Sequence, residues 1–504
     1  MKRILALALS LLLLLTALTG CQSADTGPSD TLTFITSGQA SENFDPILGL
    51  AVDFTVAHAL YSTLVDYGPE GEIIPNLADE WEEADDDMSV TFHLRDDVTF
   101  HDGTPLTADD VIYSLETIVN SPLFMWVGTD TVAGFEKVDD YTVRIDKVAP
   151  YVKLFETLAE YGFILPKEYH SQDPDAFDQA PIGSGPYKLV SKEADNSVIL
   201  EAYDGYFGDE PGFKNVVVKA PLEPANVVIA LETGEADFAP ELPATQAALV
   251  EAYQDLTIVR PDIAWRSNMI LLEGDLLSND ENLRKAIFHG INLENAVTLG
   301  NEGVGEPATE LFADFIVGDY AGTIENYVGY DEALAREYLE KSNYNGEEIT
   351  LTISSNPALA ESILSDLGKL GINIAINQLD SNDYYAKMYD GSLQMVLTFL
   401  GSNVDSLISL LDYFTSTNEF YGQFMVCDEE FDQLLAAAKA EPDEAAREEL
   451  TRQAYQRLYD LACVVPLYDV TSNYSYGPDV TYDYPISAVA MFYYLDKIMP
   501  AAAE

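Results

Sequence analysis

The side chains that could perform catalysis or hold a metal are scattered along this sequence. None of the five histidines falls in an H-E-x-x-H or Cys-His spacing, so a zinc site is not expected. Adjacent acids such as Asp109-Asp110 or Glu82-Glu83 could be proposed as a general acid and base. With 86 acidic residues, however, such pairs arise by chance, and no G-x-S-x-G nucleophile elbow is present. The sequence therefore predicts no catalytic residue, no metal site and no cofactor, and a secreted hydrolase stays open only as the weaker alternative.

The N-terminus predicts export. Lys2 and Arg3 precede a short apolar run, which is typical of a signal peptide and shorter than the ~20 residues of a membrane span. The letters L-T-G-C, ending at Cys21, resemble a bacterial lipobox, in which the cysteine is acylated; the alternative is an ordinary cleaved signal. We expect a lipoprotein signal peptide over 1–20, a tether over 21–30, and a protein lipid-anchored outside the cytoplasm. It would lie in the periplasm or on the outer face of the cell membrane.

The charge balance excludes some partners. The chain has 25 basic and 86 acidic residues and a net charge of −61, which disfavours nucleic acid and anionic membrane surfaces. The acidity suits a solvated surface or, alternatively, a cationic ligand. Because charges are screened over ~8 Å at physiological salt, only carboxylates inside a cleft would serve the second role. Beyond Cys21 the only cysteines are Cys427 and Cys463, too few for a disulfide scaffold, and their spacing does not decide whether they pair.

The most informative stretch is 77–116. Its pattern predicts a helical turn ending at Trp81, a half-buried strand over 90–95, a tight turn at Gly103 and a helix capped by Thr107. None of these elements is catalytic, so the stretch indicates a structural block.

The same block resembles the signature of solute-binding protein family 5, which includes oligopeptide-, dipeptide- and nickel-binding receptors of ABC importers. The matching runs are P-N-L-A-D-E-W, T-F-H-L-R and F-H-D-G-T-P-L-T-A-D-D-V-I-Y-S-L-E, and I-G-S-G-P-Y-K-L after residue 181 resembles a further landmark. The resemblance implies an α/β fold of the periplasmic-binding-protein type II, or Venus flytrap. Such a protein has two lobes with a hinge, plus the extra domain of the peptide-binding class. It is a receptor and not an enzyme.

The resemblance also divides the mature chain into three domains. Domain I is expected in three pieces, at 31–64, 182–262 and 481–504. Domain II would cover 65–181 and domain III 263–480. Within domain III, strand and helix patterns alternate, as a two-way α/β domain requires.

Ligand contacts are implied in both lobes. In the family the loop after the first strand faces the ligand, which makes Gln39, Ala40 and Ser41 candidates, with a plain surface loop as the alternative. Trp126 lies in a segment where relatives often place an aromatic side chain toward the cleft, although a tryptophan is more often core.

The second group of candidates is Leu400, Gly401, Asn403 and Asp405. Peptide-binding relatives carry a W-x-x-D-like segment here, whose carboxylate pairs with the ammonium group of the ligand. This chain has Leu400 in place of the tryptophan and Asn403 in place of the aspartate. Asp405 either replaces that carboxylate or caps the following helix.

The resemblance thus implies a monomeric extracytoplasmic receptor that passes a small solute to ABC permease subunits. A peptide is the first expectation for the solute. The alternative is the same fold binding a nickel chelate, a sugar or a polyamine.

Overall fold

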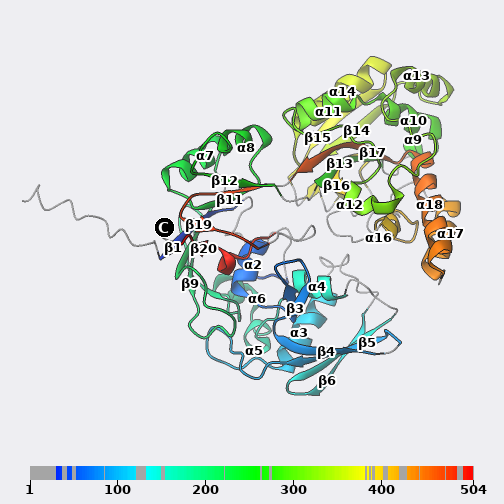
Figure 1. Cartoon of the computed structure of the whole chain (residues 1–504). Coiled ribbons are helices and arrows are strands. Elements are labelled where there is room, and N and C mark those ends of the chain that lie inside the picture. The colour runs from blue at the N-terminus through cyan, green and yellow to red at the C-terminus, as the bar shows by residue number, and fades with distance from the viewer. Residues whose placement is uncertain are drawn as a thin grey trace, which may run out of the picture.

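The computed structural model has two lobes (Figure 1). Lobe one comprises the described residues up to 260 and from 473 onward, and lobe two those within 264–471. Each lobe has its own hydrophobic core, and the cores share no residue. The structure describes residues 30–36, 43–47, 53–84, 86–120, 132–148, 154–220, 222–260, 264–271, 275–380, 383–384, 387–388, 392–400, 407–418, 428–441, 443–471, 473–484 and 492–502.

The central sheet of lobe one is mixed and has seven strands. Its strand β1 runs parallel to two neighbours, so that Phe34 lies beside Val218 on one side and Phe238 on the other. Leu32 and Phe34 are buried, as the alternating pattern predicts. In sheet order the strands are β12 (Thr257–Val259), β18 (Tyr474–Tyr476), β11 (Phe238–Pro240), β1 (Thr31–Ile35), β10 (Asn215–Lys219), β9 (Val198–Ala202) and β8 (Tyr187–Lys192).

The first part of the most informative stretch of the sequence lies in a four-stranded antiparallel sheet. The predicted alternation is confirmed, because Val90, Phe92 and Leu94 are buried. The predicted helical turn ending at Trp81 is wrong. Ala78–Glu83 form a strand that places Trp81 opposite Phe92, and this cross-strand pairing outweighs the local helical preference. In order the strands are β4 (Ala78–Glu83), β5 (Ser89–Leu94), β7 (Thr142–Lys147) and β6 (Val132–Asp139), and a separate hairpin consists of β2 (Val65–Tyr67) and β3 (Ile73–Pro75).

The turn and the helix after β5 form as predicted. Gly103 has φ +85°, a conformation that glycine adopts without strain. Thr107 and Asp110 form a capping box at the start of α3. Because both signals are local, they could be identified from the sequence.

The apolar pattern over 51–65 predicts an amphipathic helix, and helix α2 is shorter than that segment. It begins after its N-cap Asp53 and ends at Leu60, because Tyr61 is extended and its hydroxyl donates to the carbonyl of Phe44. The helices of lobe one are α2 (Phe54–Leu60), α3 (Ala108–Val119), α4 (Leu154–Tyr161), α5 (Lys167–His170), α6 (Pro174–Gln179), α7 (Pro224–Thr233), α8 (Ala244–Val250) and the 3-10 turn η4 (Leu495–Lys497).

Lobe two is built on a five-stranded sheet. Strand β14 runs parallel to β15 and β16, and β13 runs antiparallel to β16 and β17. The sheet order is β15 (Asn373–Gln378), β14 (Glu348–Ile353), β16 (Met395–Leu400), β13 (Ala264–Leu271) and β17 (Val464–Thr471). The helices are α9 (Asp275–Ser278), α10 (Glu281–Gly290), α11 (Leu293–Gly300), α12 (Asp314–Val317), η2 (Gly318–Tyr320), α13 (Glu332–Lys341), α14 (Pro357–Leu370), α16 (Leu407–Asp412), α17 (Glu429–Ala440) and α18 (Glu444–Leu461).

Two short crossings join the lobes. The chain enters lobe two between β12 and β13 and leaves it between β17 and β18. The strands that flank the two crossings are paired, β12 with β18 in lobe one and β13 with β17 in lobe two. Strand β18 falls within the predicted domain III, yet it pairs in the sheet of lobe one. The division into three domains stays a prediction.

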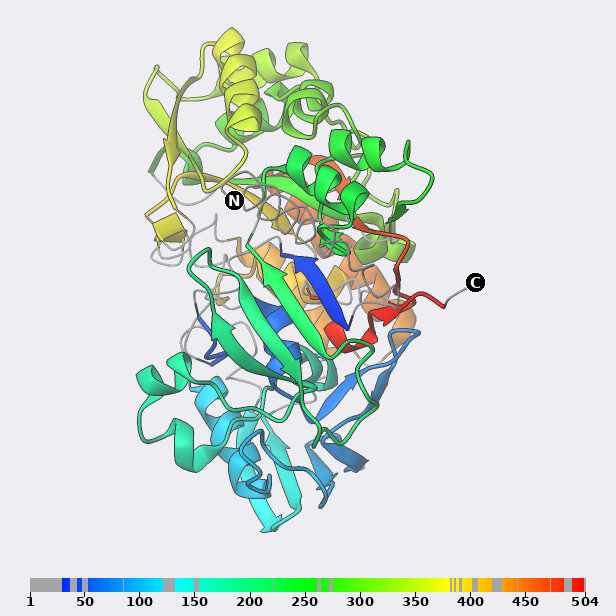
Figure 2. The same ribbon diagram turned by 90° about the vertical axis from the view of Figure 1, so that its left-hand side faces the viewer.

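The C-terminal part of the chain lies against lobe one (Figure 2). There β20 (Met499–Pro500) pairs with β19 (Val480–Thr481). In the part of the chain that the structure describes, no helix has the length and apolar character needed to cross a bilayer.

Candidate site between the lobes

Carboxyl ends of parallel strands in both lobes lead into the segments predicted to contact a ligand. Strand β1 ends at Ile35, shortly before 39–41, and β16 ends at Leu400, directly before 401–405. In open α/β sheets, ligands bind outside the carboxyl ends of the strands. The candidate site is therefore the region between the two lobes that these ends approach.

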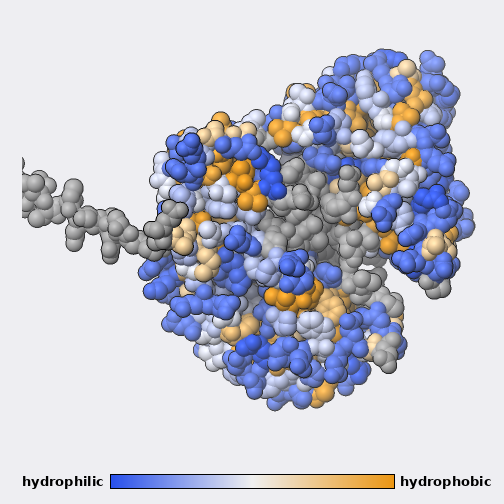
Figure 3. Space-filling model, viewed as in Figure 1, coloured by the Kyte–Doolittle hydropathy of each residue, from blue (hydrophilic) through white to orange (hydrophobic). Residues whose placement is uncertain are grey.

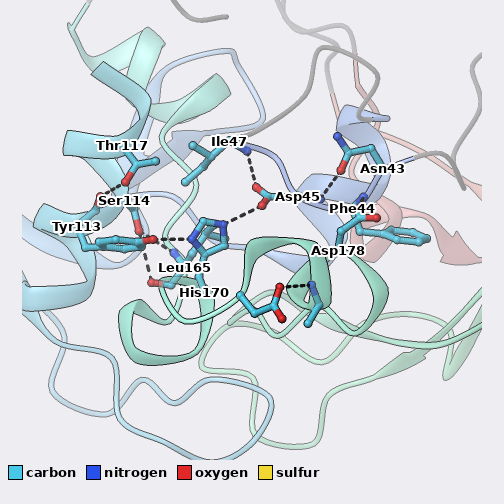
Figure 4. A network of polar contacts seen from close by, with 12 residues as sticks. Asn43, Phe44, Asp45, Ile47, Tyr113, Ser114, Thr117, Leu165, His170 and Asp178 are labelled. Carbon is cyan, nitrogen blue, oxygen red and sulfur yellow. Dashed lines mark hydrogen bonds and ion pairs between the residues drawn. The ribbon is translucent and has the colours of Figure 1, made fainter. Parts of the chain in front are cut away.

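A buried polar network holds the corner that follows β1 (Figure 4). The carboxylate of Asp45 lies 2.7 Å from Nε2 of His170 and accepts from the amide of Ile47 at 3.0 Å. The hydroxyl of Tyr113 lies 2.6 Å from Nδ1 of the same histidine. Asp45 and His170 are each 1% exposed. The network fixes residues 43–47 against helices α3 and α5.

This Asp-His-Tyr arrangement is a positioning device. A carboxylate only accepts hydrogen bonds, so Nε2 of His170 donates to Asp45, while Nδ1 is hydrogen-bonded to the Tyr113 hydroxyl. Both ring nitrogens are therefore occupied and the ring is buried. These contacts fix the orientation of the ring.

Further bonds anchor the chain on both sides of the corner. The amide of Phe44 donates to Asp178 at 2.6 Å. Asp53 accepts from the hydroxyl of Thr36 at the end of β1 and caps α2 by accepting from the amides of Thr55 at 3.0 Å and Val56 at 3.2 Å. Burial raises the pKa of Asp53, and these hydrogen bonds oppose the rise. The residues that precede and follow the predicted ligand loop are thus held in place.

Aromatic rings cover the face of lobe one around α2. His58 stacks on Phe492 with ring centroids 3.6 Å apart, and Phe54 packs edge-on against Tyr161 at 5.4 Å. Burial lowers the pKa of His58 to about 3, so the ring is uncharged at neutral pH. Burial raises the pKa of Tyr161, and Tyr413 of lobe two adds to the rise. The aromatic cluster around α2 is thus largely buried, with an uncharged His58 at its centre.

In lobe two, a fully buried arginine underlies the end of β16. Arg266 is the partner of Leu400 across β13 and β16, and Leu400 is 4% exposed in the core. The guanidinium of Arg266 donates to both oxygens of Asp469 at 2.7 Å and to the carbonyl of Glu310 at 2.7 Å. Its charge is therefore already paired.

The carboxyl end of β14 adds polar groups that sequence reasoning missed. Ser354 is half-buried and Ser355 is exposed, directly after β14 and beside β16. Asn356 has φ +55°, caps α14, and donates to the carbonyl of Gly300 at 2.7 Å and the hydroxyl of Tyr468 at 3.1 Å. The signal that could have identified these residues is their place between a buried strand and an Asn-Pro helix start.

A glycine-rich segment supports α2 from the other side. The amide of Gly183 donates to Nδ1 of His101 at 3.2 Å, and Nε2 of His101 lies 3.1 Å from the carbonyl of Gly185. A Cβ atom on Gly183 would lie 1.9 Å from the carbonyl oxygen of Leu60, so only glycine fits there. Burial lowers the pKa of His101 to about 4, which keeps it neutral. These contacts give His101 a structural role.

An apolar pocket of about 30 Å³ beside α3 and α4 is lined by residues such as Leu115, Phe135 and Leu158 and offers almost no polar surface to orient a solute. Among the described residues, no group of three or more histidines, cysteines or acids is placed to hold a metal ion.

Most of the predicted site residues lie outside the described part of the chain, and their roles stay predictions. These residues are Cys21, Gln39, Ala40, Ser41, Trp126, Gly401, Asn403 and Asp405. Leu400 is described, and its side chain packs in the core of lobe two. Cys427 also lies outside, so the possible pairing with the buried Cys463 stays open.

Comparison with known proteins identifies the class to which this site belongs. The family model of the bacterial extracellular solute-binding proteins, family 5 (middle part), matches residues 72–422. The chain belongs to this family, as the sequence block around residues 77–116 predicts. It is therefore an extracytoplasmic solute-binding protein.

The similarity to individual relatives extends over most of both chains. The dipeptide-binding protein of Escherichia coli (strain K12) is 26% identical over 476 residues, which cover 86% of this chain and 88% of the relative. The nickel-binding periplasmic protein of the same strain is 22% identical over 440 residues, 81% of this chain and 83% of the relative.

Solved structures confirm the fold. The periplasmic binding protein DppA from Helicobacter pylori in complex with the peptide STSA has a TM-score of 0.80 at 23% identity, covering 94% of this chain and 99% of that one. The binding protein AgaA of Agrobacterium tumefaciens R10 in complex with agropinic acid has a TM-score of 0.81, also at 23% identity, with the same coverage. The predicted periplasmic-binding-protein type II fold is confirmed.

Proposed function

We propose that this protein is the receptor of an ABC importer and that it binds small peptides between its lobes. The observation that carries the proposal is the pair of adjacent crossings between two separately cored lobes, in a chain that belongs to the solute-binding family. Two short connections allow the lobes to move as rigid bodies. A ligand that touches both lobes stabilises the closed arrangement by its higher affinity for it.

The names of relatives support a peptide as the solute. They include a dipeptide-binding protein and a di/tripeptide-binding protein, and solved neighbours hold the peptides STSA and Met-Leu. In this proposal the contacts come from Gln39, Ala40 and Ser41 in lobe one and from the segment 400–405 in lobe two, with Asp405 pairing with the peptide ammonium. Trp126 supplies an aromatic contact.

The second candidate is a solute that is not a peptide. The same family includes a nickel-binding protein, and one solved neighbour holds agropinic acid. In lobe two this chain has Leu400 and Asn403 where the W-x-x-D-like segment implied by the family resemblance has tryptophan and aspartate. A nickel chelate, a sugar or a polyamine is therefore the alternative to a peptide as the solute.

The lipid anchor, the partner proteins and the oligomeric state belong to the same proposal. Cys21 would carry the lipid that tethers the receptor to the membrane, and ABC permease subunits would take the solute from a monomeric receptor. We assign the protein no enzymatic activity, because family 5 proteins are transport receptors.

The test is a thermal-shift screen of the soluble chain beginning at residue 22, against di- to pentapeptides, sugars, polyamines and nickel chelates. A ligand at 100 times its Kd adds about 2.7 kcal/mol to the free energy of unfolding, which raises the melting temperature clearly. We expect peptides to give this rise and Asp405→Asn to abolish it. The control is Glu448→Gln, a change of the same kind at an exposed position of α18. If only compounds of another class stabilise the protein, the assignment of a peptide as the solute is wrong. If the protein hydrolyses a peptide, the proposal that it is a transport receptor is wrong.

A further inference from the structure

A direct contact joins the two lobes in addition to the crossings. Oε2 of Glu302, in the loop after α11 of lobe two, accepts from the hydroxyl of Thr245 at 2.6 Å and from its amide at 3.1 Å. Thr245 lies in the first turn of α8 in lobe one. The N-cap of this helix is Pro243, whose side chain has no atom that can accept a hydrogen bond. The first turn of α8 therefore takes a side-chain acceptor from the other lobe.

The contact connects the edges of the two sheets that approach the candidate site. In lobe one, α8 follows β11, which runs parallel to β1, so the start of α8 lies at the carboxyl edge of the sheet. In lobe two, Asn356 directly follows β14, which runs parallel to β16, and it donates to the carbonyl of Gly300 at 2.7 Å. Glu302 is two residues further along the chain. Because both partners lie at these facing edges, the contact forms when the lobes approach and breaks when they separate.

The loop that carries Glu302 holds its side chain in a fixed orientation. Glu302 has φ +54°, a left-handed conformation that is strained for a residue with a Cβ atom. The amide of Gly303 donates to the carbonyl of Val297 at 3.0 Å, and the side chain of Asn301 donates to the carbonyl of Val304 at 2.6 Å. Such strain persists only where the surrounding structure enforces it, and it is concentrated at functional positions. Here it directs a carboxylate toward the other lobe.

Both sides of the contact are tied to the crossing between β17 and β18. Asn473, which follows this crossing, accepts from the amide of Leu242 at 3.1 Å and donates to its carbonyl at 2.8 Å. Leu242 is three residues before Thr245. In lobe two, Gly305 lies so close to Asp469 of β17 that an added Cβ atom would be 2.9 Å from its carbonyl oxygen. A rotation of the lobes about the crossing therefore moves the two partners of the contact relative to each other.

Exposed apolar side chains flank the contact on a surface whose visible face is mostly hydrophilic (Figure 3). Leu249 is 50% exposed and lies one helical turn after Thr245, on the same face of α8. Val304 is 46% exposed and lies two residues after Glu302. A closer approach of the lobes at this point would cover apolar surface in addition to the two hydrogen bonds.

We propose, resting on the receptor function above, that Thr245 and Glu302 form an interlobe latch. The latch stabilises the closed arrangement of the lobes and raises the affinity for the solute without contacting it. Because binding and closure are linked, a contact that exists only in the closed arrangement adds to the apparent affinity. Two exposed hydrogen bonds are too weak to hold the lobes together alone. The free protein is therefore an equilibrium between the latched arrangement and more open ones, and the solute shifts it toward the latched one.

The experiment compares Glu302→Ala with the natural protein, both as the chain beginning at residue 22. Isothermal titration with trialanine and with spermidine measures the affinity, and small-angle X-ray scattering without solute measures the radius of gyration. We expect Glu302→Ala to weaken the binding of either probe by about three- to tenfold, the effect of two hydrogen bonds, and to increase the radius of gyration. The control is Glu294→Ala, which removes the same charge from an exposed position of α11 and should change neither quantity.

Two further variants test whether the contact itself is responsible. Thr245→Val loses only the hydrogen bond of the hydroxyl and should weaken binding by about two- to threefold. In the double variant with Glu302→Ala it should have no further effect, because the acceptor is already gone. Glu302→Gln keeps an acceptor oxygen and should lose less affinity than Glu302→Ala.

The outcomes separate the latch from the identity of the solute. If a probe binds the natural protein and Glu302→Ala equally well, or if the losses of the two single variants simply add in the double variant, the latch is refuted. If spermidine binds and trialanine does not, the peptide assignment fails and the latch is decided with spermidine. If neither probe binds, the scattering decides: an unchanged radius of gyration in Glu302→Ala refutes the latch, and a larger one supports it.

Discussion

The contact between Gly183 and α2 allows a quantitative test of how lobe one is assembled. In Gly183→Ala the new Cβ atom would lie 1.9 Å from the carbonyl oxygen of Leu60, where ordinary contacts begin near 3.4 Å. Either backbone must therefore move by about 1.5 Å, the difference between these two distances. Overpacking costs about 1–3 kcal/mol, and here both sides are backbone, so we expect a loss of about 3 kcal/mol in the free energy of unfolding.

The matched control is Gly368→Ala in helix α14. An added Cβ there meets nothing within 4 Å, and alanine is the better helix former, so we expect a gain of about 0.5–1 kcal/mol. Neither glycine has a positive φ, so the comparison reports contacts and not backbone strain. Urea unfolding followed by circular dichroism measures both variants. If Gly183→Ala were as stable as the natural protein, the packing described for α2 would be refuted.

Four further predictions follow from the cores and the N-terminus. Burial raises the pKa of Asp66 to about 7, so the natural protein should lose stability as the pH rises from about 4 to 7. The midpoint of urea unfolding, measured at a series of pH values, should fall over this range for the natural protein and should not fall in this way for Asp66→Asn. Burial lowers the pKa of His101 to about 4, so the free energy of unfolding should fall as the pH falls from 6.5 to 4. In His101→Gln this dependence of stability on pH should be weaker. Asp45→Asn leaves a buried imidazole N–H without its charged acceptor, so we expect it to lower the free energy of unfolding in urea by about 2–3 kcal/mol and to weaken solute binding. Unchanged stability would show that Asp45 does not anchor the corner after β1. Cys21→Ser should move the protein from the membrane fraction to the soluble extracytoplasmic fraction, and retention in the membrane would refute the lipid anchor.

Local signals in the sequence predicted many of the elements correctly. Asp331 caps α13, and Gly234 and Gly371 end α7 and α14 in left-handed conformations. An aspartate before a helical pattern and a glycine after one predict these helix ends. Each signal depends on a bond or a backbone conformation within a few residues, so no tertiary information is needed.

Elements that depend on distant partners were predicted less well. Ala78–Glu83 is a strand only because β5 lies beside it, and α2 ends at Leu60 where Gly183 and Gly185 pack against it. Strand β18 returns to lobe one before the predicted end of domain III at 480, because its partners β11 and β12 lie there.

In the candidate site, too, contacts between residues far apart in the sequence could not be predicted. His170 and Asp45 are separated by 125 residues, and no spacing in the sequence connects them. Ser354 and Ser355 become candidates only once β14 and β16 are seen to run parallel. The family resemblance named the loops at the ends of β1 and β16, while the structure shows the anchors that hold the chain beside them.

The central claim is that a solute closes the two lobes around itself. Small-angle X-ray scattering of the chain beginning at residue 22, with and without the best-binding compound of the thermal-shift screen, measures this directly. We predict a smaller radius of gyration in the presence of the solute and the same compound recovered unchanged afterwards. A saturating solute that leaves the radius of gyration unchanged, or that is converted to a product, would contradict the account.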